Sequence, residues 1–249
     1  MQFMDTHIHL QDFKTKNATD IIEDAAASGV EKMVCVSAAE DDWGKAAALA
    51  RQFPDRVVPA FGLHPWYARE AMPDWEQRLA GYLEQHPQAL VGEAGLDRFR
   101  DKEAEPQNAV FKIQLELAKE YNRPLLIHAV RAQGWLDKYW KLLPAKFVFH
   151  SFNGRRELLD KILKAGGYVS LSPFVLRNPH KEEIVPLIPI ERLLLETDGP
   201  SQSLNRGSEG TPRELPVLAA EIAALRDEET EYLAAQVYQN SLEFINAGK

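Results

Sequence analysis

Short apolar runs recur along the chain, and most of them end abruptly in polar or titratable residues. The runs have the length and the β-branched or aromatic content of buried strands. Segments with helical spacing of apolar residues lie between them, as at Val110, Ile113, Leu117 and Ala118. This alternation predicts a parallel sheet whose strands are connected by crossover helices.

The pattern assigns most of the chain to regular elements. The expected strands cover residues 2–7, 32–37, 57–61, 89–92, 124–127, 146–149, 167–171 and 192–195. The expected helices cover residues 18–28, 41–52, 74–85, 105–121, 133–142, 155–164, 180–186, 214–224 and 229–245. The sequence therefore predicts an α/β protein with a (β/α)8 TIM barrel as its single domain, residues 1–249, since such barrels typically need about 250 residues. The long irregular segments 62–73, 96–104 and 199–213 follow strand ends and should line the catalytic mouth.

Residues that can bind a metal stand at or just after the downstream ends of several runs. They are His7, His9, Glu93, His128, His150 and Asp198. The downstream ends of parallel strands converge on one mouth of a barrel. The alternative is that each histidine is a satisfied core residue, but so many buried polar groups without a shared partner would be costly. The sequence therefore predicts a metal site.

Each of these residues has an expected role. His7 and His9 share one face of a strand, about 7 Å apart, and can bind the same ion. Glu93, the only acid expected at the end of its strand, can bridge two cations, and His128 and His150 can hold the second. Asp198 can ligate a metal and also accept a proton from the attacking water. We expect two divalent ions, drawn from Zn, Mn, Co and, less well, Mg.

Other polar and aromatic residues near the mouth are candidates for binding substrate. His64 should either contact a phosphate or form a structural hydrogen bond, and Trp66 should either stack on a base or pack on the rim. Arg131 can bind phosphate, although a surface position is the alternative for any single arginine. His86, at a helix end, is expected to be exposed.

Composition narrows the class of protein. An apolar share of 45% supports one large core, and the single cysteine, Cys35, excludes an internal disulfide framework. We expect a cytoplasmic protein without an obligate protein partner, because residues 1–16 do not resemble a signal peptide and no apolar stretch approaches a membrane span. The net charge of -8 argues against non-specific adhesion to nucleic acid. It leaves a nuclease open, since bound cations supply local positive charge.

Six motifs occur along the chain in an order that is typical of a known family. They are Asp5-Thr6-His7-Ile8-His9-Leu10, Phe61-Gly62-Leu63-His64-Pro65, Val91-Gly92-Glu93-Ala94-Gly95-Leu96-Asp97, Leu126-Ile127-His128, Phe149-His150-Ser151-Phe152-Asn153-Gly154 and Leu195-Glu196-Thr197-Asp198-Gly199-Pro200. In order and spacing they resemble the motifs of TatD-related hydrolases over nearly the whole chain. The resemblance implies an amidohydrolase-like, metal-dependent TIM barrel with two-ion chemistry and exonuclease or DNase activity. It also implies that the six ligand positions are those named above.

Two positions depart from the family pattern. Val130 stands where members commonly have an arginine, with Arg131 one place later, and Thr211-Pro212-Arg213 stands where they commonly have an Asn-x-Pro element. We expect a deoxyribonuclease or phosphodiesterase that acts on single-stranded DNA or a small phosphoester, with Asp198, Glu93 and His64 as catalytic residues. The alternative is a hydrolase of a small ester or amide, of the deacylase or lactonase type. A non-catalytic metal-binding protein is the third reading, and it would not need to keep Asp198.

Overall fold

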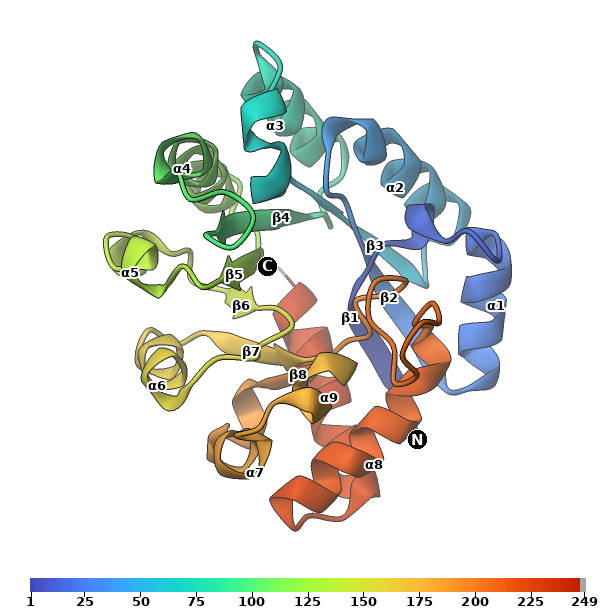
Figure 1. Cartoon of the computed structure of the whole chain (residues 1–249). Helices are drawn as coiled ribbons and strands as arrows, with labels where there is room; N and C mark the ends of the chain where they lie inside the picture. The colour runs from blue at the N-terminus through green and yellow to red at the C-terminus, as the bar shows by residue number, and fades with distance from the viewer. Residues whose placement is uncertain (247–249) are drawn as a thin grey trace.

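The computed structural model describes residues 1–246, and its strands form one eight-stranded parallel sheet in chain order. The strands are β1 Phe3–Ile8, β2 Val30–Val36, β3 Val57–Phe61, β4 Leu90–Asp97, β5 Leu125–Val130, β6 Phe147–Phe149, β7 Tyr168–Leu171 and β8 Leu193–Leu195. Figure 1 shows helices surrounding these strands. The predicted TIM barrel is confirmed. The predicted domain bounds include residues 247–249, which lie outside the described residues.

The helices follow the strands in alternation. They are α1 Ala18–Ala27, α2 Glu40–Gln52, α3 Trp75–Gln85, α4 Ala104–Glu120, α5 Gln133–Leu136, α6 Arg156–Lys164, α7 Lys181–Ile184, α8 Leu215–Arg226 and α9 Thr230–Ile245. A 3-10 helix, η2, covers Pro65–Glu70 after β3. Within residues 1–246, no helix is long and apolar enough to cross a membrane.

The barrel interior is filled by inward-facing side chains and closed at one end by α9. The interior cluster consists of Met4, Val34, Val36, Ala60, Leu90, Leu126, Val148, Tyr168, Leu194 and Phe244. Phe244 comes from α9, is fully buried, and packs edge-to-face on Tyr168 with ring centroids 5.3 Å apart. Figure 1 shows α9 behind the barrel, so the polar strand ends are left at the opposite mouth.

Main-chain hydrogen bonds join the first and last strands beside that mouth. The Asp198 N–H donates to the His7 carbonyl oxygen at 2.9 Å, and the His9 N–H donates to that of Gly199 at 2.8 Å. The Thr6 hydroxyl donates to the Leu195 carbonyl oxygen at 3.0 Å. Three candidate ligands, His7, His9 and Asp198, are therefore fixed relative to one another by the backbone.

Three expected elements differ most from the structure. Strand β4 continues to Asp97 because Gly95, Leu96 and Asp97 pair with β5, so the irregular segment begins later than residue 96. The expected helix 133–142 is only the short α5 followed by a 3-10 turn. The expected helix 180–186 ends at Ile184, just before Pro186, which has no N–H for the helical ladder.

Candidate metal centre

The structure brings together all six residues that the sequence analysis assigned to metal binding. One group surrounds Oε2 of Glu93, which lies 3.2 Å from His7 Nε2 and 3.4 Å from His9 Nε2. Asp198 Oδ1 completes the group, at 3.9 Å from His7 Nε2 and 3.6 Å from His9 Nε2. These nitrogen and oxygen atoms are close enough to share one cation.

A second group surrounds the other carboxylate oxygen of the same residue. Glu93 Oε1 lies 2.8 Å from His128 Nδ1, 2.9 Å from His150 Nε2 and 3.2 Å from His64 Nε2. The two imidazoles of His128 and His150 are in contact, with Nδ1 and Nε2 3.2 Å apart. Each oxygen of Glu93 therefore faces its own set of imidazole nitrogens. A carboxylate in that position can bind one cation with each oxygen.

The backbone around Glu93 requires glycine on the preceding side. Gly92 has a φ of +155°, and a β-carbon there would lie 2.6 Å from the Leu126 side chain. The Glu93 N–H donates to the Ser37 carbonyl oxygen at 2.9 Å, which fixes the carboxylate above the barrel. The main chain thus holds Glu93 of β4 next to the end of β2, at the mouth where the candidate ligands meet.

A hydrogen bond to the main chain sets the tautomer of His9, and the neighbouring carboxylates favour a positive charge beside its ring. His9 Nδ1 lies 2.9 Å from the Val36 carbonyl oxygen, which only accepts, so Nδ1 carries a proton. In the neutral ring, Nε2 would then direct a lone pair at carboxylate oxygens of Glu93 and Asp198. Burial opposes a charge on His9, but its hydrogen bonds to Asp198 and Glu93 prevail and raise its pKa to about 10. Either a proton on His9 Nε2 or a divalent cation next to it would balance the negative charge of these carboxylates. The set of donor atoms therefore fits a metal.

Glu196, which the sequence analysis did not place in the site, lies behind the ligands. It is 1% exposed, and its Oε1 is 3.4 Å from His150 Nδ1 and accepts from the Ser151 N–H at 2.6 Å. A ring nitrogen of His7 lies within 4.8 Å of an oxygen of the same carboxylate. Among residues 1–246, His7 Nδ1 has no hydrogen-bond partner. A carboxylate behind metal-binding imidazoles orients the rings. The sequence could have indicated this position in the site, because Glu196 directly follows the apolar run of β8.

Asp97 is a second residue that the sequence analysis missed, because β4 was expected to end at residue 92. Glu93 is therefore not the only acid at the end of this strand. Asp97 Oδ2 lies 3.3 Å from His128 Nε2 and accepts from Trp66 Nε1–H at 2.7 Å. Burial opposes ionisation of Asp97, but the hydrogen bonds from His128 and Trp66 hold its pKa below the usual range.

His64 has its tautomer fixed by the chain itself. The Trp66 N–H donates to His64 Nδ1 at 3.1 Å, so Nδ1 carries a lone pair and Nε2 carries the proton of the neutral ring. Burial lowers the pKa of His64 to about 4, although the charge of Glu93 opposes this shift. A protonated nitrogen is no metal ligand, so His64 presents an N–H donor to the centre.

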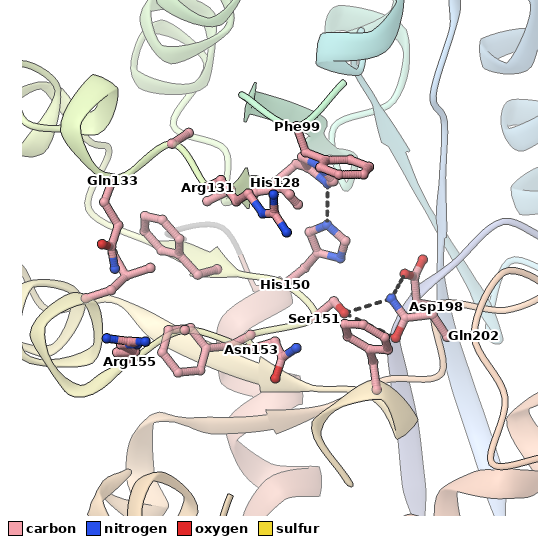
Figure 2. Close-up of a pocket in the computed structure, with 18 residues that line it drawn as sticks. Phe99, His128, Arg131, Gln133, His150, Ser151, Asn153, Arg155, Asp198 and Gln202 are labelled. Carbon is pink, nitrogen blue, oxygen red and sulfur yellow. Dashed lines mark hydrogen bonds between the residues drawn. The ribbon is translucent and has the colours of Figure 1, made fainter. Parts of the chain in front are cut away.

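A cavity of about 590 Å³ opens beside the second group (Figure 2). Its lining includes the aromatic rings of Phe99 and Phe174 and the side chains of Arg131 and Arg155. The Arg131 guanidinium lies over the ring of Phe99, 4.8 Å from its centroid. The substrate-binding candidate Arg131 is thus on this rim. Trp66 is 51% exposed and donates its Nε1–H to Asp97.

One expectation for a histidine outside the site is wrong. His86 is buried rather than exposed, with its ring centroid 5.4 Å from that of Phe61. Its position at a helix end did not reveal that Phe61 and Tyr82 cover it.

An eight-stranded barrel with buried histidines and carboxylates at the carboxyl ends of its strands defines the class of metal-dependent TIM-barrel hydrolases. The family described as TatD related DNase matches residues 4–246 of this chain. The chain therefore belongs to the TatD family of metal-dependent hydrolases.

Individual relatives agree with this assignment over nearly their full length. The 3'-5' ssDNA/RNA exonuclease TatD of Pantoea ananatis is 34% identical over 241 residues, which cover 89% of this chain and 90% of that protein. An uncharacterized metal-dependent hydrolase of Methanocaldococcus jannaschii is 27% identical and covers 98% of this chain and 97% of its own. The crystal structure of the TatD homolog YjjV from Escherichia coli K12 superimposes with a TM-score of 0.90 at 28% identity, covering 99% of this chain and 98% of that one.

Proposed function

We propose that this protein cleaves phosphodiester bonds of single-stranded DNA with two divalent cations held on either side of Glu93. The proposal rests on one observation, that the two oxygens of Glu93 face different histidines. Oε2 faces His7 and His9, and Oε1 faces His128 and His150. A two-cation centre suits in-line displacement at phosphorus, where attacking and leaving oxygens both need stabilisation. The name of the Pantoea ananatis relative, a 3'-5' ssDNA/RNA exonuclease, supports the choice of substrate.

The residues of the centre divide between the two cations. His7, His9 and Asp198 would hold one, His128 and His150 the other, and Glu93 would contact both. Bound cations would lower the pKa of a water molecule and stabilise negative charge on phosphate oxygens.

Two residues would handle protons and charge. Asp198 is 7% exposed, with one carboxylate oxygen toward His7 and His9, and it would accept the proton of the attacking water. His64 Nε2–H would donate to a phosphate oxygen, because its Nδ1 already accepts the Trp66 N–H. The low pKa of His64 keeps the ring neutral, so it acts as a hydrogen-bond donor rather than a cation.

The cavity beside the centre would receive the nucleotide next to the scissile phosphate. Phe99 and Phe174 offer apolar surface to a base, and Arg131 and Arg155 offer positive charge to a neighbouring phosphate. A cytoplasmic location and action without an obligate protein partner stay predictions from the sequence.

A panel of substrates tests this function. The purified protein is assayed on 3′-labelled single-stranded DNA, on a phosphodiester without a base, and on small carboxylate esters and lactones. We expect cleavage of both phosphodiesters, and DNA affinity that falls with salt at a slope near -0.7 for each neutralised phosphate. The Asp198→Asn variant is the control for contaminating nuclease. Hydrolysis of only the carboxylate esters or lactones, with no salt response, would replace this proposal with the deacylase or lactonase reading.

A further inference from the structure

The carboxylate of Asp198 is held from two opposite sides. Its Oδ1 lies 3.6 Å from His9 Nε2, toward the metal centre. Its Oδ2 accepts from the side-chain amide Nε2 of Gln202 at 2.5 Å, and the Gln202 N–H donates to the Asp198 carbonyl oxygen at 3.1 Å. Figure 2 shows Gln202 reaching both Asp198 and Ser151. One oxygen is therefore occupied by Gln202 and the other is left for the centre.

Two serines fix the orientation of the Gln202 amide. Gln202 Nε2 donates to the Ser151 hydroxyl oxygen at 2.8 Å, and Ser172 Oγ–H donates to Gln202 Oε1 at 2.5 Å. The two hydroxyl oxygens are themselves 2.9 Å apart. A flipped amide would place its carbonyl oxygen against the Asp198 carboxylate, where neither group can donate. The network therefore allows one orientation, with the amide nitrogen toward Asp198 and Ser151 and the carbonyl oxygen toward Ser172.

The loop that carries Gln202 is anchored on several sides. A β-carbon at Gly210 would lie 1.5 Å from the Gln202 carbonyl oxygen, so the later part of the loop packs directly on the main chain of Gln202. Arg177 donates to the Ser203 carbonyl oxygen at 2.6 Å, and Glu214 accepts from the Leu204 N–H at 2.8 Å. A side chain on such a backbone can hold its partner in a defined position.

We propose that Gln202 is a positioning residue for Asp198, which keeps Oδ1 directed at the metal centre and prevents the carboxylate from rotating. The inference rests on the proposed role of Asp198 as ligand and proton acceptor. Loss of a residue that orients a metal ligand typically reduces metal affinity or activity about 10- to 100-fold. Gln202 acts through Asp198, so its removal should affect turnover and metal affinity rather than the binding of DNA.

The test compares Gln202→Leu and Gln202→Glu with the parent protein. Leu removes the hydrogen bonds, and Glu keeps the shape but cannot donate to Asp198 at neutral pH. We expect both variants to retain the thermal midpoint within a few degrees. We expect kcat to fall about 10- to 100-fold and Mn²⁺ affinity, measured by calorimetric titration, to weaken, with KM for DNA nearly unchanged. The matched control is Asn205→Ala, an exposed position on the same loop, which should behave as the parent.

A double-mutant cycle separates positioning from a general effect on the pocket. In an Asp198→Ala background no carboxylate remains to be held, so Gln202→Leu should cause no further loss of single-turnover rate. Additive losses, or a rise in KM without a change in kcat, would overturn the inference and assign Gln202 to substrate contact. Parent-like kcat and Mn²⁺ affinity in both Gln202 variants would also overturn it, while leaving the proposed function intact. That function fails separately if the parent protein cleaves no phosphodiester.

Discussion

His128 is held between Glu93 and a second carboxylate, Asp97, with a different ring nitrogen toward each. Nδ1 lies 2.8 Å from Glu93 Oε1, and Nε2 lies 3.3 Å from Asp97 Oδ2. A neutral imidazole carries one N–H, and donating it to Asp97 leaves the Nδ1 lone pair facing the centre. Asp97 therefore selects the tautomer that can bind a cation at Nδ1.

Replacing this carboxylate by an amide should weaken the centre. In Asp97→Asn one oxygen can still accept from the N–H groups of Phe99 and Arg100, so the local turn should persist. The new NH2 group would face two donors, His128 Nε2–H and Trp66 Nε1–H. We expect metal affinity or turnover to fall about 10- to 100-fold, measured by metal titration and steady-state kinetics. Asp101→Asn, on the neighbouring loop, should have no such effect, and equal losses in both variants would contradict this role.

Trp66 makes one contact within the protein and is proposed to make another with substrate, and a pair of variants can separate the two. Its ring is half exposed, whereas its Nε1–H donates to Asp97 at 2.7 Å. If a base stacks on the ring, Trp66→Ala should weaken binding of an oligonucleotide by about 1–3 kcal/mol, while Trp66→Phe retains most of the affinity. Binding is measured by fluorescence anisotropy with a catalytically inactive protein. A phosphodiester without a base should be spared in both, and equal losses on the two substrates would contradict stacking.

The proposed proton acceptor can be removed with little change of shape. Asp198→Asn is nearly isosteric, so the barrel should remain folded and retain some metal. The amide cannot accept the proton of water at neutral pH, and we expect turnover to fall about 10²- to 10⁴-fold. Single-turnover kinetics at saturating metal would measure the loss. Near-parent turnover would show that another group accepts the proton.

The barrel was predictable because each apolar run is short, ends in a polar residue and alternates with helical spacing. The candidate ligands were predictable because their positions relative to the runs place them at one mouth. Asp97 was missed, since Gly92 and Gly95 interrupt the apolar pattern of β4 although its backbone pairs with β5 as far as Asp97. Gln202 was missed because its position depends on contacts among three separate loops, and no local pattern in a sequence records these.

The interior of the barrel should depend on α9. Phe244 is fully buried and packs on Tyr168 at the closed end, so Phe244→Ala should reduce the free energy of unfolding by about 3–5 kcal/mol. Denaturant unfolding monitored by circular dichroism measures the change. Tyr232→Ala, at a position on the same helix that is 52% exposed, should change stability by about 0.5 kcal/mol or less. Similar losses in the two variants would contradict the interior role of Phe244.

The most direct test of the two-cation centre is a titration of metal-depleted protein with Mn²⁺ or Zn²⁺, followed in parallel by elemental analysis and cleavage of 3′-labelled single-stranded DNA. Because each oxygen of Glu93 faces its own set of nitrogens, we expect no cleavage after chelation and full activity only at about two ions per chain. Cleavage that persists in excess chelator, or that saturates at one ion per chain, would contradict the account.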